Sequence, residues 1–220
     1  TPLYSSAASD VYKRQLHWST ARYAPWQEVQ LLDGLADRVL DGSVAEVGVS
    51  NIGPKRLAWM HERLAQRGVP LRSVQVQYSL LSPGDAKADA LRQLCHERGV
   101  EVLAYSPLAF GVLTLSPDAE RRSGTFLRRQ LFNRLMPASR NLRTVVAAIA
   151  ATRNVSMAQV ALNWCRAQGT TPIPGVRTPE QARDVAGALG WSLRPEEIEQ
   201  LTEARGQCAV RTPSNPFQSA

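Results

Sequence analysis

The feature that most constrains the fold is a repeat of short apolar segments, each followed by a segment with helical spacing. The apolar segments start near residues 16, 45, 74 and 100, so the period is close to constant. Helical spacing follows them over residues 25–42 and 54–68, and around Leu91 and Leu94 up to Gly99, and Pro or Gly stands at most of these boundaries. Buried strands that alternate with helices predict an α/β fold with a parallel sheet covered by helices.

The second half of the chain departs from this period. Residues 109–140 are basic and contain Gly, Ser and Pro, and we expect them to form a long loop. Two helices are expected over residues 143–153 and 156–169, with Ser156 and Gln159 in a capping-box pattern. A fifth strand is expected over residues 170–175, and two further helices begin near Thr178 and Pro195.

A parallel β/α array is either doubly wound or closed into a barrel. The GxGxxG and GxxxxGK phosphate-binding patterns are both missing from the sequence, which favours the barrel. In such a barrel the chemistry gathers where strands pass into the following loops. Polar side chains stand at four successive strand ends and are expected to converge on one pocket: His17, Ser50, Asn51, Gln75, Tyr105 and Ser106.

Composition limits the partners that the chain can have. The net charge of +7 is concentrated in residues 120–143, where a basic loop would either hold a phosphorylated cofactor or be solvated. No helix-turn-helix, RNP or zinc-finger pattern accompanies the charge, so we expect no nucleic-acid partner and keep a basic RNA-binding fragment only as a remote alternative. The three cysteines, Cys95, Cys165 and Cys208, lack metal-ligand spacing and are expected to be reduced and structural.

Targeting signals are also missing from the printed sequence. No uncharged apolar run approaches the roughly 18 residues that a membrane span needs, and no secretory-signal layout is present. We therefore expect no membrane association and an intracellular protein, in the cytoplasm or a plastid. The chain begins at Thr1, and residues 5–15, SSAASDVYKRQ, resemble translated cloning-adapter sequence. Residues 1–15 are accordingly expected to be a non-native leader, and residues 16–220 the domain.

Five motifs occur in an order that resembles one family. LHW, GVSN, VQVQYSLL, EVLAYSPLAFGVL and PIPGVRTPEQA follow one another as in the aldo-keto reductases, from about Leu16 to the C-terminus. GALGWSL and NPFQ are most similar to the plant and algal pyridoxal-reductase-like branch. The resemblance implies strands four to eight of a (β/α)8 TIM barrel, without the first three β/α units. It further implies NADPH-dependent reduction of a small aldehyde or ketone to an alcohol.

The resemblance also assigns roles to individual residues. Tyr105 would stack on the nicotinamide ring of NADPH/NADP+, and Ser50, Asn51 and Gln75 would bind its carboxamide. His17 would orient the substrate carbonyl as a catalytic residue. Ser106 and Leu108 would lie in the loop after the seventh strand of the barrel, beside the pyrophosphate of the cofactor. Arg177 would bind the 2′-phosphate beside the helix that carries Gln181, with Arg183 and Asp184 as secondary candidates at the adenosine end.

Each assignment has a purely structural alternative. Ser50 and Asn51 would serve as caps for the helix at Pro54. His17, Tyr105 and Gln75 would be core residues whose polar groups are hydrogen-bonded, and Arg177 would be a solvated arginine.

The sequence departs from the family at Leu115-Ser116 and Val185. In addition, the family's proton-donating Tyr, its Lys and its Asp belong to β/α units that this chain does not contain. We therefore expect the chain alone to be inactive or unstable and the full-length parent to be a reductase. A noncatalytic NADPH-binding regulatory protein is the alternative, and the oligomeric state is left open.

Overall fold

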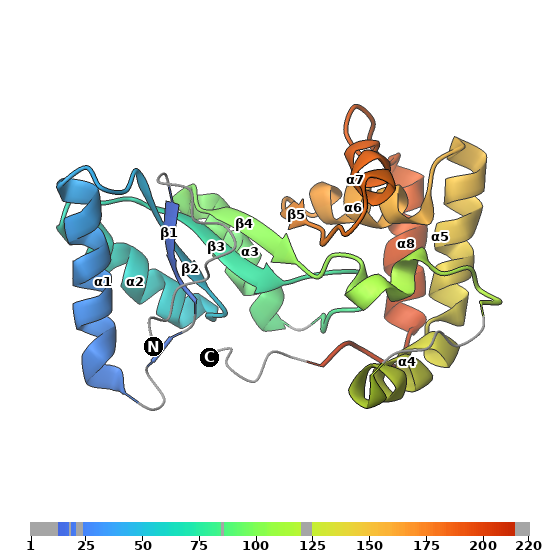
Figure 1. Ribbon diagram of the computed structural model, residues 1–220, viewed down its shortest axis with the longest axis horizontal. Helices are drawn as coiled ribbons and strands as arrows, with labels where there is room; N and C mark the ends of the chain where they lie inside the picture. Colours follow the sequence, from blue (N-terminus) through green and yellow to red (C-terminus); the bar gives the residue numbers. More distant parts are fainter. Residues whose placement is uncertain (1–12, 18, 21–23, 85, 120–124, 214–220) are drawn as a thin grey trace. The chain divides into compact units, whose positions relative to one another are not determined.

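The computed structural model describes residues 13–213 except 18, 21–23, 85 and 120–124, and it divides into two compact units (Figure 1). The first unit contains residues up to Val76 and Gly84–Leu103, and the second contains Gln77–Pro83 and Ala104–Pro213. Five strands form a sheet in the order β1-β2-β3-β4-β5, which is their order along the chain. The α/β class expected from the sequence is confirmed.

The first unit alternates strands and helices. Its elements are β1 (Lys13–Leu16), α1 (Pro25–Leu40), β2 (Glu46–Ser50), α2 (Pro54–Gln66), β3 (Leu71–Gln77), α3 (Ala86–Arg98) and β4 (Glu101–Tyr105), of which the last residues of β3 and β4 count with the second unit. β1 pairs with β2 and β2 with β3, both in parallel, with Gln15 opposite Gly48 and Gly48 opposite Ser73. The strand–helix repeat predicted from the sequence is thus present.

The core of the first unit forms where helix faces meet the sheet. Leu32 and Ala36 of α1 and Leu57 and Met60 of α2 are completely buried, because residues three and four apart share a helix face. Burial of such a side chain stabilises the fold by about 1.5–3 kcal/mol. α2 ends before Gly68, whose φ of +72° is the left-handed conformation that glycine adopts freely.

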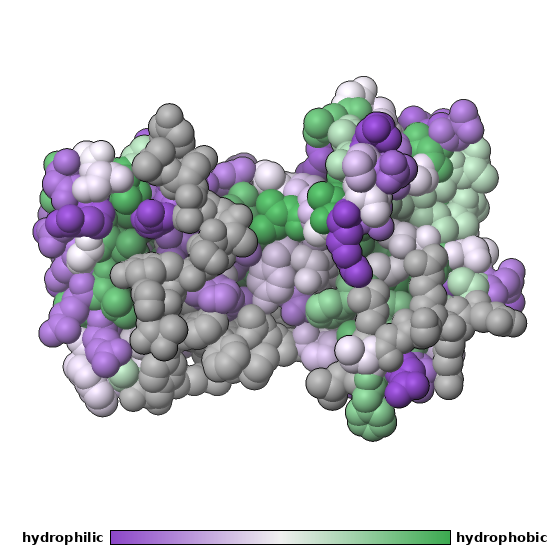
Figure 2. All heavy atoms as spheres, viewed as in Figure 1, coloured by the Kyte–Doolittle hydropathy of each residue, from purple (hydrophilic) through white to green (hydrophobic). Residues whose placement is uncertain are grey.

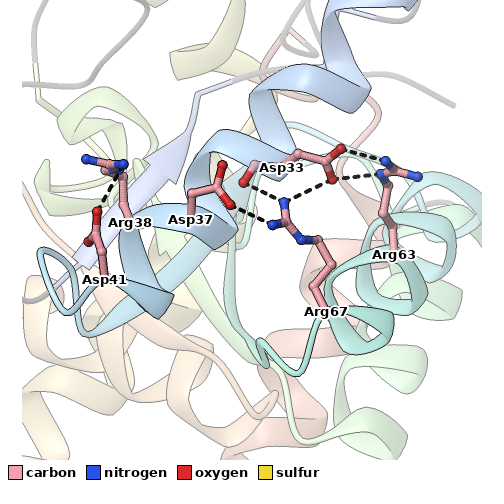
Figure 3. A network of polar contacts seen from close by, with 6 residues as sticks. All are labelled: Asp33, Asp37, Arg38, Asp41, Arg63 and Arg67. Carbon is pink, nitrogen blue, oxygen red and sulfur yellow. Dashed lines mark hydrogen bonds and ion pairs between the residues drawn. The ribbon is translucent and has the colours of Figure 1, made fainter.

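The outer faces of α1 and α2 are joined by charged side chains (Figure 3). Arg63 Nη2 lies 2.6 Å from Asp33 Oδ2, and Arg67 Nη2 lies 2.5 Å from Asp37 Oδ1. Arg63 holds Asp33 through two parallel hydrogen bonds, and this arrangement keeps the pKa of Asp33 below its ordinary value. Figure 2 shows hydrophilic side chains gathered over α1.

The second unit is mainly helical. Its further elements are η2 (Ala109–Thr114), α4 (Phe126–Ala138), α5 (Arg140–Arg153), α6 (Met157–Ala167), β5 (Thr171–Ile173), α7 (Pro179–Ala186) and α8 (Pro195–Gln207). α5 packs against α6 and α8, and α5 and α8 run side by side in Figure 1. Trp164 of α6 is buried at the centre and stacks on Tyr78 with ring centroids 5.5 Å apart.

Two expectations about element boundaries were wrong. The stretch 109–140, expected to be a loop, contains η2 and the 13-residue helix α4. α4 forms because Phe132, Leu135 and Met136 recur at helical spacing and are buried, although Asn133 and Arg134 between them conceal the pattern. β1 begins at Lys13, three residues before the expected start at Leu16, because residues 13–15 already pair with β2.

Among the described residues, no single helix has both the length and the apolar composition to cross a bilayer. α5 and α6 meet these criteria only when taken together, and the two axes are bent by 102° at the break between them.

Candidate active site

Four predicted site residues lie together at the carboxyl ends of β1, β2 and β3 in the first unit. The Ser50 hydroxyl donates to the backbone oxygen of Gln75 at 2.9 Å. The Asn51 amide nitrogen donates to the backbone oxygen of His17 at 3.0 Å and to Ser50 Oγ at 2.9 Å. These bonds tie three neighbouring strand ends together, and the grouping of these four residues agrees with the sequence prediction.

The capping alternative for Ser50 and Asn51 was wrong. Gly53, which has no side chain, is the residue at the N-cap of α2. Asn51 is buried and has a φ of 57°, a left-handed conformation that asparagine tolerates better than most residues. Its side chain instead reaches the loop that carries His17. The pair therefore ties the strand ends together, and neither of the two residues occupies the N-cap of α2.

Gln15 was missed as a site residue because the sequence analysis placed it in the non-native leader. Its amide nitrogen donates to Gln75 Oε1 at 3.0 Å, across β2. The two side chains meet above Gly48, where an added Cβ would lie 2.6 Å from Ser73 Oγ. Because the amide oxygen of Gln75 accepts from Gln15, the NH2 group is the donor end of the Gln75 side chain.

A buried carboxylate holds the loop after His17. The Ser19 hydroxyl donates to Glu28, which is completely buried in the first turn of α1 and forms an ion pair with Arg56 of α2. Arg56 also lies over the Trp59 ring, with its Cζ 4.2 Å from the ring centroid, and burial lowers its pKa. The sequence gives no signal for this pair, since Glu28 occupies an ordinary position near the start of a helix.

The second unit contains a cavity of about 470 Å³ at the loops that follow β4 and β5. Four of the predicted cofactor residues line it: Ser106, Leu108, Arg177 and Gln181. Leu115 and Val185, where the sequence departs from the family, line it as well. The volume lies within the range of small-molecule sites. Tyr105 is not among the lining residues. It is half-buried at the end of β4, and its backbone oxygen accepts from Tyr78 N at 3.2 Å.

The rim of the cavity near α7 carries an arginine beside the N-terminus of a helix. Thr178 Oγ1 accepts from the Gln181 backbone at 3.3 Å, and Gln181 Oε1 accepts from the Arg177 backbone at 2.8 Å. These two bonds fix Arg177 immediately before the helix, with its guanidinium exposed. A cation beside a helix N-terminus favours a phosphate.

Of the two secondary candidates for the adenosine end, Asp184 lines the cavity and Arg183 does not. Asp184 lines the cavity and accepts from Gln159 Nε2 at 2.9 Å. Arg183 is not a lining residue, and its guanidinium lies 3.7 Å from Glu180. Gln159, predicted to complete a capping box with Ser156, bonds Asp184 instead, while its backbone still donates to Ser156 Oγ at 3.1 Å.

The two groups of predicted residues belong to different units: His17, Ser50, Asn51 and Gln75 to the first, and Tyr105, Ser106, Leu108, Arg177 and Gln181 to the second. Their convergence on one pocket therefore stays a prediction.

Burial raises the pKa of the Cys95 and Cys165 thiols to about 12. Both remain protonated near neutral pH, as the structural role expected for them requires.

These strand-end residues and the β/α order define a class of protein. Residues 10–205 match the model of the aldo/keto reductase family, so the chain belongs to that family. The fold is confirmed as that of part of a (β/α)8 barrel. The glycerol dehydrogenase of Gluconobacter oxydans matches with a TM-score of 0.75 and 24% identity, over 93% of this chain and 61% of that one.

Among curated proteins, pyridoxal reductase, chloroplastic, of Arabidopsis thaliana is 43% identical over 93% of this chain and 56% of its own length. L-glyceraldehyde 3-phosphate reductase of Escherichia coli O157:H7 is 31% identical over 77% of this chain and 51% of its own length. The chain thus spans about half the length of these relatives. The likeness to the pyridoxal-reductase-like branch is confirmed, and membership of an oxidoreductase family is established.

Proposed function

We propose that the full-length protein reduces an aldehyde or ketone to an alcohol with NADPH, and that pyridoxal is its candidate substrate. The observation that carries the proposal is the cavity of the second unit, which brings together four residues predicted to bind the cofactor. The aldehyde substrate class is supported by the names of the two curated relatives. A homologue from Schizosaccharomyces pombe is named as an NADP(+) enzyme.

The residues of this cavity fit a phosphorylated dinucleotide. Arg177 supplies an exposed guanidinium, which binds phosphate oxygens through paired hydrogen bonds. Gln181 holds the Arg177 backbone against the first turn of α7. Leu108, Leu115 and Val185 supply apolar lining for the uncharged parts of the nucleotide.

When bound, NADPH supplies the hydride for the reduction. In this proposal Ser50, Asn51 and the NH2 group of Gln75 hold the nicotinamide carboxamide, and the Tyr105 ring covers one face of the nicotinamide. His17 orients the carbonyl of the substrate. Holding the nicotinamide ring and the substrate carbonyl in fixed orientations lowers the activation barrier to hydride transfer, because the two reacting groups are already in place.

Protonation of the alcohol oxygen requires a general acid. In the family this acid is a tyrosine on the first three β/α units, so we assign the step to the full-length protein. Loss of a general acid lowers the rate by about 10²–10⁴-fold. We therefore expect the present 220 residues to bind the cofactor without measurable turnover.

The proposal is tested by titrating the protein with NADPH and with NADH, following nucleotide fluorescence. Replacing Arg177 by Met is expected to weaken NADPH binding about ten- to a hundredfold, because the 2′-phosphate loses its cation. NADH binding is expected to stay the same. Arg183→Met is the matched control, since Arg183 lies in the helix that follows Arg177 but does not line the cavity.

Two outcomes would count against this account. Failure of the protein to bind either nucleotide would refute the cofactor assignment. Tight NADPH binding by the full-length protein, with no turnover of pyridoxal or other aldehydes, would favour the noncatalytic regulatory alternative.

A further inference from the structure

The chain around His17 is held at two points by the junction between β2 and α2. The Asn51 amide nitrogen donates to the backbone oxygen of His17 at 3.0 Å. Shortly after His17, the Ser19 hydroxyl donates to the Glu28 carboxylate, and Glu28 forms an ion pair with Arg56 in the first turn of α2. Asn51 and Arg56 belong to the same short stretch of the sequence, so this stretch holds His17 from both sides.

The contacts that hold Ser19 are shielded from water. Glu28 and Thr20 are completely buried, and Ser19 is nearly so. The Thr20 backbone oxygen accepts from the Ala24 backbone at 2.8 Å, directly before the start of α1. A buried carboxylate that is both hydrogen-bonded and ion-paired has a fixed position, because moving it would leave a charge unpaired away from water. Ser19 is therefore fixed to α1 through Glu28 and to α2 through Arg56.

The stability of the two helices does not account for this arrangement. A glutamate in the first turn favours a helix when it is exposed to solvent, without the cost of burial. The attraction between a buried carboxylate and its cation often only offsets the loss of hydration. Other ion pairs already join α1 to α2, between Arg63 and Asp33 and between Arg67 and Asp37. The buried carboxylate is accounted for if the position of the chain beside His17 matters.

We propose that Ser19, Glu28 and Arg56 are positioning residues that hold His17 in place for hydride transfer. This inference rests on the proposed function, in which His17 orients the substrate carbonyl and Asn51 holds the nicotinamide carboxamide. Since Asn51 also holds the His17 backbone, the hydride donor and the hydride acceptor are both located by the β2–α2 junction. A displacement of about 1 Å between reacting groups lowers a rate by about 10²-fold.

The experiment measures a single turnover of the full-length protein. Protein with bound NADPH is mixed rapidly with excess pyridoxal, and the loss of NADPH absorbance is followed. The rate constant reports hydride transfer in the folded protein, and the amplitude reports the fraction of protein that is folded and loaded. NADPH affinity and the urea midpoint of unfolding are measured in parallel.

Two variants remove the contacts of Glu28 from opposite sides. Ser19→Ala removes the hydroxyl beside His17 and leaves the ion pair, and Arg56→Met removes the cation. Each is expected to lower the rate constant about ten- to a hundredfold, with the amplitude and the NADPH affinity unchanged. Ser43→Ala is the matched control and is expected to react as the wild type does. The Ser43 hydroxyl is exposed and also donates to a carboxylate, that of Asp41, just after the end of α1.

The outcomes separate this inference from the proposed function. Wild-type protein that oxidises no NADPH with pyridoxal or other aldehydes would refute both. An active wild type, with Ser19→Ala and Arg56→Met reacting at the wild-type rate constant, would refute only the positioning roles. A smaller amplitude and a lower urea midpoint, with the rate constant unchanged, would show a purely structural role and would also overturn the inference.

Discussion

At the scale of single residues, Gly48 shows how one missing Cβ organises the strand ends. It lies in β2 between Gln15 of β1 and Ser73 of β3. The Ser73 hydroxyl oxygen is buried and makes no hydrogen bond among the described residues. The absence of a side chain at position 48 lets the Gln15 amide reach Gln75.

We expect Gly48→Ala to destabilise the protein by about 1–3 kcal/mol, because its methyl group would meet Ser73 Oγ at 2.6 Å. Ser73→Ala alone is expected to be neutral or slightly stabilising, since it removes an unpaired buried hydroxyl. The double variant is expected to recover most of the loss. Urea unfolding measures all three variants, and a double variant as unstable as Gly48→Ala would contradict this account.

At the scale of elements, an ion pair between a partly exposed arginine and a buried carboxylate joins α5 to α8. Arg153 binds both carboxylate oxygens of Glu197, at 2.8 and 2.6 Å, and Glu197 is buried. Glu197 also accepts from the Arg194 backbone at 2.7 Å, at the start of α8. The hydrogen bonds from Arg153, more than any other cause, lower the pKa of Glu197 to about 2.

Because of this lowered pKa, the free energy of unfolding depends on pH. Because the pKa in the folded protein lies below the ordinary value of 4.5, the stabilisation is complete above that value and is lost as the pH falls to about 2. Glu197→Gln is expected to cost about 3 kcal/mol at pH 7, and the difference from wild type should shrink between pH 5 and pH 2. Glu196→Gln, exposed in the same turn, is the control. A difference that does not change with pH, measured by denaturant titration, would refute the assignment.

The charged residues between α1 and α2 in Figure 3 make a weaker contribution. Asp33 and Arg63 are each about 30% exposed, and exposed pairs of this kind stabilise by less than about 1 kcal/mol. Asp33→Asn is expected to destabilise the protein by roughly 0.5–1 kcal/mol at low salt. The loss should diminish at high salt because salt screens the pair. Thermal unfolding at two ionic strengths measures this, and a loss that is independent of salt would argue against an electrostatic origin.

The elements also show what the sequence could predict. α1 and α2 follow from apolar spacing with Pro25 and Pro54 at their first turns, because both signals are local. α4 was missed because its buried face is short and is interrupted by Asn133 and Arg134. The left-handed backbone conformation of Phe110 in η2, with a φ of 59°, has no local signal, since it arises from the packing of buried neighbours on either side.

At the scale of the whole molecule, the β/α period predicted the sheet, and the ordered motifs predicted the family. The strand-end cluster was predicted because parallel strands bring their carboxyl ends to one edge of a sheet. The supporting residues Gln15 and Glu28 were not predicted, because their roles depend on contacts with Gln75 and Arg56 that lie far away in the sequence.

The central claim is that this chain is part of an NADPH-dependent carbonyl reductase. In the most direct test, the full-length protein is incubated with pyridoxal and with NADPH deuterated at one or the other C4 position of the nicotinamide. The mass of the alcohol product is then measured by mass spectrometry. The account predicts an alcohol that carries one deuterium from only one of the two labelled forms, because one face of the ring is covered. No deuterated alcohol from either form, under conditions in which the protein binds NADPH, would contradict it.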